Sequence, residues 1–417
     1  MPRRIFAVLA LLAVALPARA ADWPGAWLQY TATGTTELRA VAPPGLACPA
    51  MTADGKALNV TTRGVADTAY PLQVCVAAVP AGARKLAAGG LPAPSPVQAL
   101  RRIVVVGDTG CRLKGGTIQD CNVPAAWPFD TVARLAARQR PDLVIHVGDY
   151  HYRETPCPAN RPGCVATPAG DVWAVWKADF FDPAAPLLAV APWLLVRGNH
   201  ELCWRGGKGW FRLLDARTAT DCVARTEPFA ITIDRQQFLM LDSADADDQT
   251  AAVEPVAHYR TQFTSLLAQA RPGAWLLTHR PVWALAQFPG VTPGTSGNAT
   301  MQAAIQGLVP ASLDMVLSGH VHDFTAYDFG PARPAQLVVG EGGSANDAIA
   351  QPLDPGVKID GLAIRKVLGF ADYGYLTLDR ATVGWNGTVH GLDDAVLATC
   401  RFIGRTAECR LVNRGRT

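Results

Sequence analysis

Five apolar segments of this chain each run directly into polar residues that can bind a metal ion, and this recurrence limits the possible folds more than any other feature. The segments cover residues 103–106, 143–147, 193–196, 275–278 and 315–318. Each is short and rich in Val, Leu or Ile, which is typical of a strand buried on both faces. Ligands of α/β proteins gather at the carboxyl ends of such strands. We therefore expect one crevice to bring together the polar residues that follow these segments, namely Asp108, residues 149–152 and 199–201, His279, His320 and His322.

From about residue 101 onward, strand-like segments alternate with helix-like segments, which predicts an α/β fold. Apolar residues recur at helical spacing in residues 129–139, 172–181 and 255–270. Near the end, residues 373–378, 382–385 and the segment around Cys400 have the composition of antiparallel strands. We expect these last strands to complete a second sheet.

The segment before residue 98 has a different character. Short β-like pieces at residues 36–41, 57–62 and 72–79 are separated by Pro and Gly turns. Residues 89–96 contain three prolines and two adjacent glycines, which is typical of a linker. We predict a small β-rich N-terminal domain with its linker over residues 21–97, followed by the main domain over residues 98–417.

Residues 1–20 have the pattern of an export signal. Arg3 and Arg4 precede an apolar stretch at residues 5–16, and Ala18-Arg19-Ala20 resembles a processing site. The paired arginines leave two export routes open, the general secretory route and the twin-arginine route. No later segment has the apolar length of a transmembrane helix. We expect a periplasmic or secreted protein without a membrane span.

The charge balance argues against a nucleic-acid or membrane-surface partner. The chain has 38 basic and 35 acidic residues, and removal of the signal would take away three arginines and leave no net charge. A chain without a basic excess has no electrostatic attraction for these polyanions. The sequence itself does not specify an oligomeric state.

The ten cysteines indicate disulfides, because an exported protein matures in an oxidising compartment. Spacing alone does not determine their connectivity, but their order favours local bridges. The alternative is a zinc site, which the absence of any C-x-x-C arrangement disfavours. The expected pairs are Cys48 with Cys75, Cys111 with Cys121, Cys157 with Cys164, Cys203 with Cys222, and Cys400 with Cys409.

The polar residues at the five strand ends suit two neighbouring metal ions. They include carboxylates, an amide oxygen and imidazoles, and a carboxylate can bridge two ions. The motifs occur in the order D-x-G, G-D-x-x-Y, G-N-H-E, x-x-x-H and G-H-x-H. Over residues 101–323, this order resembles the purple acid phosphatases within the calcineurin-like metallophosphoesterases. The resemblance implies a four-layer α/β/β/α sandwich of two mixed β-sheets flanked by helices, with residues 98–417 as the catalytic domain.

One detail of the first motif selects the subgroup. Most of the wider superfamily has a histidine where this chain has Gly110, and Tyr152 resembles the replacement ligand. The resemblance then implies a ferric ion beside a divalent iron, zinc or manganese ion. The implied ligands are Asp108, Asp149, Tyr152 and His322 for the first ion, and Asp149, Asn199, His279 and His320 for the second.

This resemblance implies hydrolysis of phosphate esters by a metal-bridging hydroxide, with Asp149 and His200 as the catalytic residues. His200 would orient the phosphate or protonate the leaving oxygen. Its alternative role is to orient Asn199, together with Glu201. The expected substrate is a small-molecule phosphomonoester. A phosphodiesterase or nucleotidase with the same metals is the alternative, and a metal-binding surface protein without turnover is the third reading.

Several other polar residues have plainer interpretations. His146 lies inside an apolar segment and is expected to be a hydrogen-bonded core residue. His151 is expected to face solvent, and Arg112 and Lys114 to be solvated loop residues, although both could meet phosphate charge. An acidic loop is predicted to be a solvated turn and not a calcium site; it contains Asp245, Asp247 and Asp248.

Overall fold

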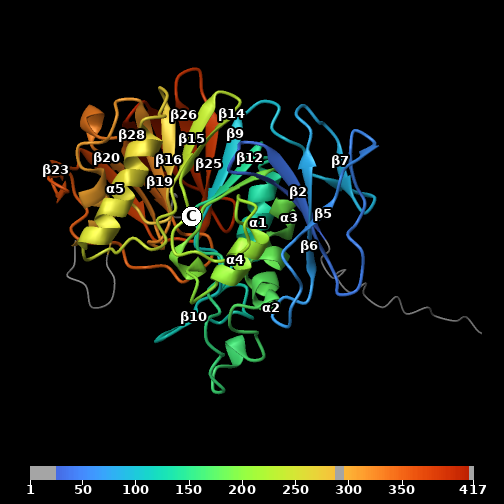
Figure 1. Cartoon of the computed structure of the whole chain (residues 1–417). Coiled ribbons are helices and arrows are strands. Elements are labelled where there is room, and N and C mark those ends of the chain that lie inside the picture. Colours follow the sequence, from blue (N-terminus) through green and yellow to red (C-terminus); the bar gives the residue numbers. More distant parts are fainter. Residues whose placement is uncertain (1–24, 287–294, 413–417) are drawn as a thin grey trace, which may run out of the picture.

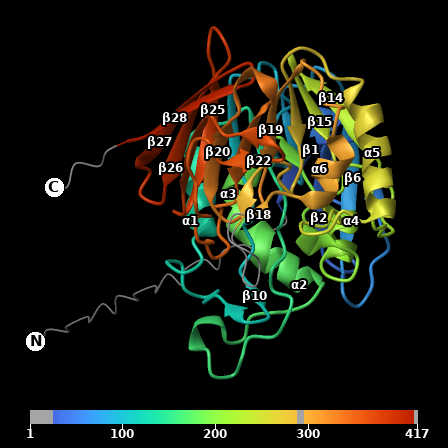
Figure 2. The same ribbon diagram turned by 90° about the vertical axis from the view of Figure 1, so that its left-hand side faces the viewer.

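Two large β-sheets face each other in this protein, and helices lie against the outer side of each (Figures 1 and 2). The computed structural model describes residues 25–286 and 295–412. Apolar side chains from both sheets fill the space between them, including Val105 and Ile145 from the first sheet and Phe238 and Leu317 from the second. The predicted four-layer α/β/β/α sandwich is therefore confirmed.

The first sheet has eleven strands within the described residues. Its central strands β9, β12 and β13 run parallel, and all residues of β12 and β13 are buried, as a sheet covered on both faces requires. In spatial order the strands are β28 (Thr406–Leu411), β27 (Val396–Ile403), β26 (Trp385–Gly391), β25 (Gly374–Arg380), β9 (Arg102–Val106), β12 (Leu143–His146), β13 (Trp193–Leu195), β1 (Ala26–Tyr30), β2 (Thr36–Ala42), β6 (Gln73–Val79) and β5 (Thr61–Arg63).

The second sheet has seven strands in the same part of the chain. Its strands β15, β16, β19 and β21 are parallel neighbours. The spatial order is β14 (Phe229–Ile233), β15 (Gln236–Met240), β16 (Ala274–Leu277), β19 (Leu313–Ser318), β21 (Ala335–Val339), β20 (Phe324–Asp328) and β24 (Lys366–Phe370). Three two-stranded ribbons lie outside these two sheets: β10 (Leu113–Lys114) with β11 (Thr117–Ile118), β17 (Leu285–Ala286) with β18 (Thr295–Ser296), and β22 (Lys358–Ile359) with β23 (Leu362–Ala363).

The helices follow the predicted segments closely. Helices α1 (Phe129–Arg138), α3 (Asp182–Leu188) and α4 (Gly207–Leu213) pack on the first sheet, and α5 (Val253–Leu267) and α6 (Ala299–Ile305) pack on the second. Helix α2 (Trp173–Trp176) continues through a π-helical turn, Lys177–Phe181, into α3. In α1, buried side chains recur at helical spacing, which places one apolar stripe on the sheet. The helices expected at 129–139, 172–181 and 255–270 are confirmed with small shifts at their ends.

Four of the N-terminal strands do not form a separate sheet but join the first one. Strand β1 pairs in parallel with β13, so β1, β2, β6 and β5 extend the first sheet. This pairing satisfies backbone groups that would otherwise lie at an open sheet edge beside β13. The sequence pattern identified the strands but contains no signal for this long-range pairing.

We call strands β1, β2, β6 and β5 the N-terminal extension of the first sheet. A small separate sheet packs against this extension, and both contribute side chains to one apolar cluster. Leu28 and Leu38 from the extension contact this cluster together with Met51 and Leu86 from the small sheet. Part of the expected linker, residues 91–93, belongs to this sheet. Its strands are β4 (Lys56–Ala57), β3 (Met51–Ala53), β7 (Leu86–Ala88) and β8 (Leu91–Ala93). The division of the chain into domains at residue 97 stays a prediction.

The C-terminal strands also join a different sheet from the one expected. Strand β25 pairs antiparallel with β9, so β25 to β28 extend the first sheet and not the second. The strand prediction itself is confirmed. The choice of sheet depends on which central strand has an open edge, and composition does not encode this.

The predicted export signal, residues 1–20, lies outside the described residues. In residues 25–286 and 295–412, no helix combines the length and the apolar character needed to cross a bilayer.

All five predicted disulfides are present. The bonded pairs are Cys48–Cys75, Cys111–Cys121, Cys157–Cys164, Cys203–Cys222 and Cys400–Cys409. The bonded cysteines are 7 to 27 residues apart in the sequence, and the expectation of local bridges is therefore confirmed.

Arg63 on β5 attaches the N-terminal extension to α4 and to the segment after it. Its buried guanidinium donates to the carbonyl oxygens of Phe211 at 2.7 Å and Ala219 at 3.2 Å. We expect Arg63→Met to lower the free energy of unfolding by about 2 to 3 kcal/mol, because it leaves buried carbonyl groups without donors. Urea denaturation would measure this. The exposed Arg84 offers the control, since Arg84→Met should change stability by less than about 0.5 kcal/mol; equal effects of the two substitutions would contradict the role of Arg63.

Candidate active site

The seven predicted metal-binding residues all follow parallel strands and meet where the two sheets face each other. Strands β9, β12 and β13 contribute their carboxyl ends from the first sheet, and β16 and β19 contribute theirs from the second. Because parallel strands place their carboxyl ends at one edge, the loops after them are neighbours in space. The convergence expected from the sequence is present in the structure.

The hydroxyl of Tyr152 is the meeting point of one group of donors. It lies 2.9 Å from Oδ2 of Asp149, 3.0 Å from Oδ1 of Asp108 and 2.7 Å from Nε2 of His322. All four side chains are buried. A phenol, two carboxylates and an imidazole thus surround a single point.

A second group of donors lies beside the same carboxylate of Asp149. Nε2 of His279 is 3.1 Å from Oδ2 of Asp149 and 3.0 Å from Oδ1 of Asn199. One ring nitrogen of His320 lies within 4.8 Å of ligand atoms of Asp149 and His279. Asp149 therefore belongs to both groups, which is the position that a bridging ligand would need.

Three residues of this cluster have strained backbone conformations. Asp108, Asp149 and His320 have φ angles of 54°, 62° and 75°, in the left-handed region that non-glycine residues rarely adopt. Such strain persists only where the surrounding structure imposes it, and it concentrates at functional sites. All three strained residues follow the carboxyl end of a strand and belong to the donor cluster.

Two glycines allow the backbone to approach the buried carboxylates. A Cβ atom at Gly198 would lie 2.0 Å from Oδ1 of Asp149, and one at Gly319 would lie 2.3 Å from Oδ2 of Asp108. Both distances are far below van der Waals contact. The glycines of the G-N-H-E and G-H-x-H motifs are therefore required by close packing.

Glu201 ties two of the site loops together. Its carboxylate accepts backbone N–H groups from Asp149 at 3.1 Å, Tyr150 at 2.9 Å, His151 at 3.1 Å and Gly198 at 2.9 Å. Burial, and then the charge of Asp149, raise the pKa of Glu201 to about 8, whereas the backbone donors favour its charged form. Glu201 thus holds the loop after β12 against the loop after β13.

His200 lies over the ring of Tyr152, with the ring centroids 3.7 Å apart. Its Nδ1 lies 2.6 Å from Oε1 of Glu154 and 2.6 Å from a guanidinium nitrogen of Arg205, and its Nε2 lies 3.7 Å from Asp149. Burial is the main cause that lowers the pKa of His200 to about 3. Sequence patterns did not identify Glu154 or Arg205, because neither belongs to one of the five motifs.

The electrostatics of the cluster fit a bound cation. Burial, and then the charges of Asp149 and Asp108, raise the pKa of Tyr152 well above its ordinary value. Burial of two carboxylates without a nearby positive charge is costly. A cation at this point would offset the carboxylate charges and favour the phenolate. The oxygen-rich donor set around Tyr152 suits a hard, highly charged ion, and the imidazoles and amide around Asn199 suit a divalent one.

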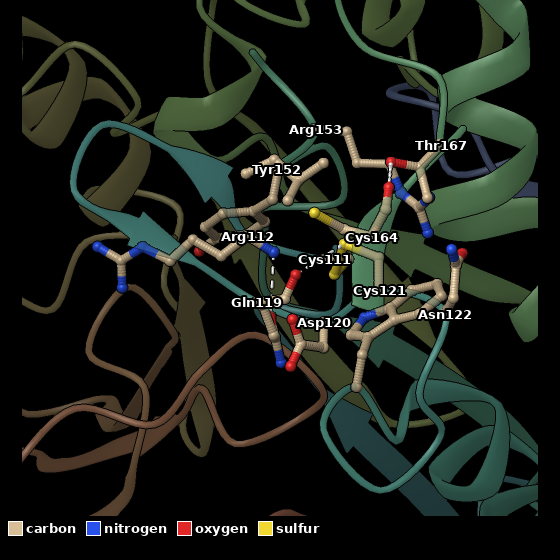
Figure 3. Close-up of a disulfide and its surroundings, with 12 residues drawn as sticks. Cys111, Arg112, Gln119, Asp120, Cys121, Asn122, Tyr152, Arg153, Cys164 and Thr167 are labelled. Atoms are coloured by element: carbon tan, nitrogen blue, oxygen red, sulfur yellow. Dashed lines mark hydrogen bonds between the residues drawn. A yellow bond between two sulfur atoms is a disulfide. The ribbon is translucent and has the colours of Figure 1, made fainter. Parts of the chain in front are cut away.

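A disulfide-linked hairpin borders the site. Figure 3 shows the Cys111–Cys121 disulfide with Arg112, Gln119 and Tyr152 around it. The backbone N–H of Leu113 donates to the carbonyl oxygen of Tyr152 at 3.1 Å, so the hairpin is fixed to the ligand loop. Arg112 is not simply solvated, because its guanidinium lies 3.8 Å from Asp347 in the loop that also contacts His322.

Besides that of Arg112, two more of the plainer predictions are wrong, and one is confirmed. His151 is 1% exposed and its Nε2 contacts the carbonyl oxygen of Gly170 at 3.0 Å, so it does not face solvent. Asp248 is not part of a solvated turn, because its carboxylate lies 2.9 Å from Nε2 of His320. His146 is a core residue and contacts the hydroxyl of Thr109 at 2.9 Å, as expected. No sequence motif marks the contact of Asp248.

Comparison with known sequences identifies related proteins. The family model of the calcineurin-like phosphoesterases matches residues 101–324, which is more than half of the chain. A nucleotide pyrophosphatase/phosphodiesterase from barley, Hordeum vulgare, is 27% identical over 124 residues. That alignment covers 30% of this chain and 29% of the barley protein, so this chain matches less than a third of its relative's length.

Two solved structures have a similar fold, and the alignment with each covers almost the whole of this chain. The purple acid phosphatase PPD1 from yellow lupin, Lupinus luteus, has a TM-score of 0.52 and 16% identity, and the match covers 92% of this chain and 73% of the lupin chain. PhoD has a TM-score of 0.55 and 13% identity, with coverage of 96% and 94%. At these identities the similarity concerns the fold.

The contacts of Glu201 generate a testable expectation. Glu201→Gln replaces an oxygen that accepts backbone N–H groups with an amide NH₂, which cannot accept them. We expect the free energy of unfolding to fall by about 2 to 3 kcal/mol. Urea denaturation of the full chain measures the change. Glu227→Gln at an exposed position is the matched control, and a Glu201 variant as stable as this control would show that the carboxylate does not tie the loops together.

Proposed function

This chain belongs to the calcineurin-like phosphoesterase family, and on that premise we propose that it is a phosphomonoesterase with a mixed iron(III) and divalent-metal centre. Membership makes it a metal-dependent phosphoester hydrolase. The family, together with the fold of the lupin purple acid phosphatase, implies a dinuclear metal centre. The choice of a monoester substrate, the identities of the metals and the ligand assignment are our proposal.

The contact geometry of the Tyr152 hydroxyl is the single observation that carries the proposal. It lies within 3.0 Å of Asp108, Asp149 and His322. A ferric ion held by these four side chains would be stabilised by three anionic oxygens once the phenol loses its proton. The second ion, divalent iron, zinc or manganese, would be held by Asp149, Asn199, His279 and His320, with Asp149 as the bridge.

Bound metal ions would supply an activated water molecule and positive charge for the phosphate oxygens. The protein's own groups complete the site. His200 presents Nε2 on the side of Asp149. We propose that this ring orients the phosphate, while Arg205 and Glu154 fix the position of the ring.

Export from the cytoplasm is part of the same proposal. Five disulfides occur in the described residues, and disulfides are stable in oxidising compartments such as the periplasm or the extracellular space.

Substitution of Tyr152 tests the ferric site. A tyrosinate bound to iron(III) absorbs visible light, so the purified iron-loaded protein should be coloured. Tyr152→Phe should abolish the band, because it removes the phenolate oxygen. Tyr150→Phe is the matched control, since Tyr150 is equally buried and its hydroxyl contacts the carbonyl oxygen of Val196; its spectrum should be unchanged. An active, iron-free and colourless wild-type protein would contradict the ferric centre.

A phosphodiesterase or nucleotidase is the second candidate, because the barley relative is named for such an activity. A feature near the site is compatible with a larger substrate. Trp204 is 75% exposed, and the guanidinium carbon of Arg205 lies 5.3 Å from its ring centroid. Since Arg205 also contacts His200, this exposed aromatic ring lies close to the site and could stack on a base.

The ratio of rates on a nitrophenyl phosphate and on the bis-nitrophenyl ester separates the two candidates. We expect the monoester to be hydrolysed at least about tenfold faster, which corresponds to about 1.4 kcal/mol of transition-state preference. A diester preference would favour the second candidate. Asn199→Ala is the control for both, because it should abolish either activity. Turnover that is unaffected by this substitution would point to a contaminant and to a metal-binding protein without turnover.

A further inference from the structure

The three imidazoles of the proposed metal centre are each held by an acceptor outside it. Nδ1 of His279 lies 2.8 Å from the carbonyl oxygen of Val147, and Nδ1 of His322 lies 2.8 Å from the carbonyl oxygen of Ala345. These contacts leave Nε2 of both rings on the side of the centre, facing Asp149 and Tyr152 respectively. Such contacts fix the tautomer and orientation of a metal-binding histidine.

His320 differs from the other two because its acceptor is a carboxylate. Its Nε2 lies 2.9 Å from Oδ2 of Asp248. A charged acceptor forms a stronger hydrogen bond than a carbonyl and makes the other ring nitrogen a better electron donor. The ring is reversed relative to His279 and His322, so His320 would coordinate a metal through Nδ1.

Asp248 is held in place from several sides. The side-chain amide of Asn298 donates to Oδ1 of Asp248 at 2.8 Å, and the same Asn298 caps helix α6 through the backbone N–H of Met301 at 2.8 Å. The guanidinium of Arg280 also forms an ion pair with Asp248. Because α6 and two site loops position this carboxylate, it is a fixed acceptor and not a mobile surface group.

The contacts of Asp248 also connect the ends of two strands. Arg280 follows His279 at the end of β16, and its backbone N–H donates to the hydroxyl of Ser243 at 2.9 Å. His320 follows β19. One carboxylate therefore contacts residues of both loops that contribute imidazoles to the proposed second ion. A displacement of one loop would change the contacts that hold the other.

We infer that Asp248 is a positioning residue for the second metal ion, which orients His320 and strengthens its binding through Nδ1. This inference rests on the proposed dinuclear centre and extends it to a residue that no motif contains. Arg280 forms an ion pair with the same carboxylate, and a nitrogen of its guanidinium lies 3.0 Å from Nε2 of His320.

The neighbouring acidic residues do not share this role and provide the control. Asp245 pairs with Arg225 at 2.8 Å, and Asp247 accepts the backbone N–H groups of Gln249 and Thr250 at 2.8 and 2.7 Å. Three carboxylates within four positions of one loop thus have three different partners. Asp245→Asn therefore matches Asp248→Asn in chemistry and location.

Zinc titration of the metal-stripped full chain, by competition with a coloured chelator, tests the inference. The wild-type protein should bind two zinc ions. Asp248→Asn should weaken one of the two by about 10- to 100-fold and leave the other unchanged. Asp245→Asn should bind both as the wild type does, and Asp248→Glu, which keeps the charge, should recover most of the loss.

The outcomes separate this inference from the proposed function. A wild-type protein that binds no zinc ion would refute the proposed divalent site itself, whereas the first site is proposed for iron(III). Zinc binding by the wild type, with equal affinities in Asp248→Asn and Asp245→Asn, would overturn the role of Asp248 alone. Should Asp248→Asn fail to fold, nitrogen NMR of the zinc-loaded wild type with labelled histidines decides the question: the proton of His320 is expected on Nε2, and a proton on Nδ1 would overturn the inference.

Discussion

Burial of two carboxylates between two sheets is the constraint on which the rest of this site depends. Asp108 and Asp149 are almost fully inaccessible to solvent, and both belong to loops that follow central parallel strands. A buried carboxylate needs hydrogen bonds and positive charge in fixed positions. The backbone N–H of His320 donates to Asp108, and that of His200 donates to Asp149. Each carboxylate is thereby held by a loop that itself contributes an imidazole.

The loops gain their rigidity from contacts that lie one layer away from the carboxylates. Glu201 accepts backbone donors from two loops, the Cys111–Cys121 hairpin is fixed to the Tyr152 carbonyl, and Asp248 contacts both loops of the second sheet. These groups are acidic or cross-linked rather than apolar, since an irregular loop must satisfy its polar backbone groups. Polar contacts therefore fix the loops of the site, and apolar packing holds together the two sheets from which these loops extend.

The sequence predicted most of this arrangement because strand ends have a strong local signature. Apolar runs identified the parallel strands, and the motifs after them identified the seven clustered donors through their resemblance to the purple acid phosphatases. The failures involve contacts between distant segments. Pairing of β1 with β13 placed the N-terminal strands in the first sheet, and pairing of β25 with β9 placed the C-terminal strands there. Local periodicity is the same for either sheet, so it does not choose between them.

The sequence by itself determined which residue types follow each strand and the α/β class, because these depend on composition and short spacing, and the order of the cysteines favoured the local disulfides. Only the tertiary structure decided which polar side chains reach the donors. Asp248 and Asp245 are chemically identical and three positions apart, yet one contacts His320 and the other Arg225. The direction of each side chain depends on how the loop folds against α6 and β16, and that is a consequence of packing between segments far apart in the chain.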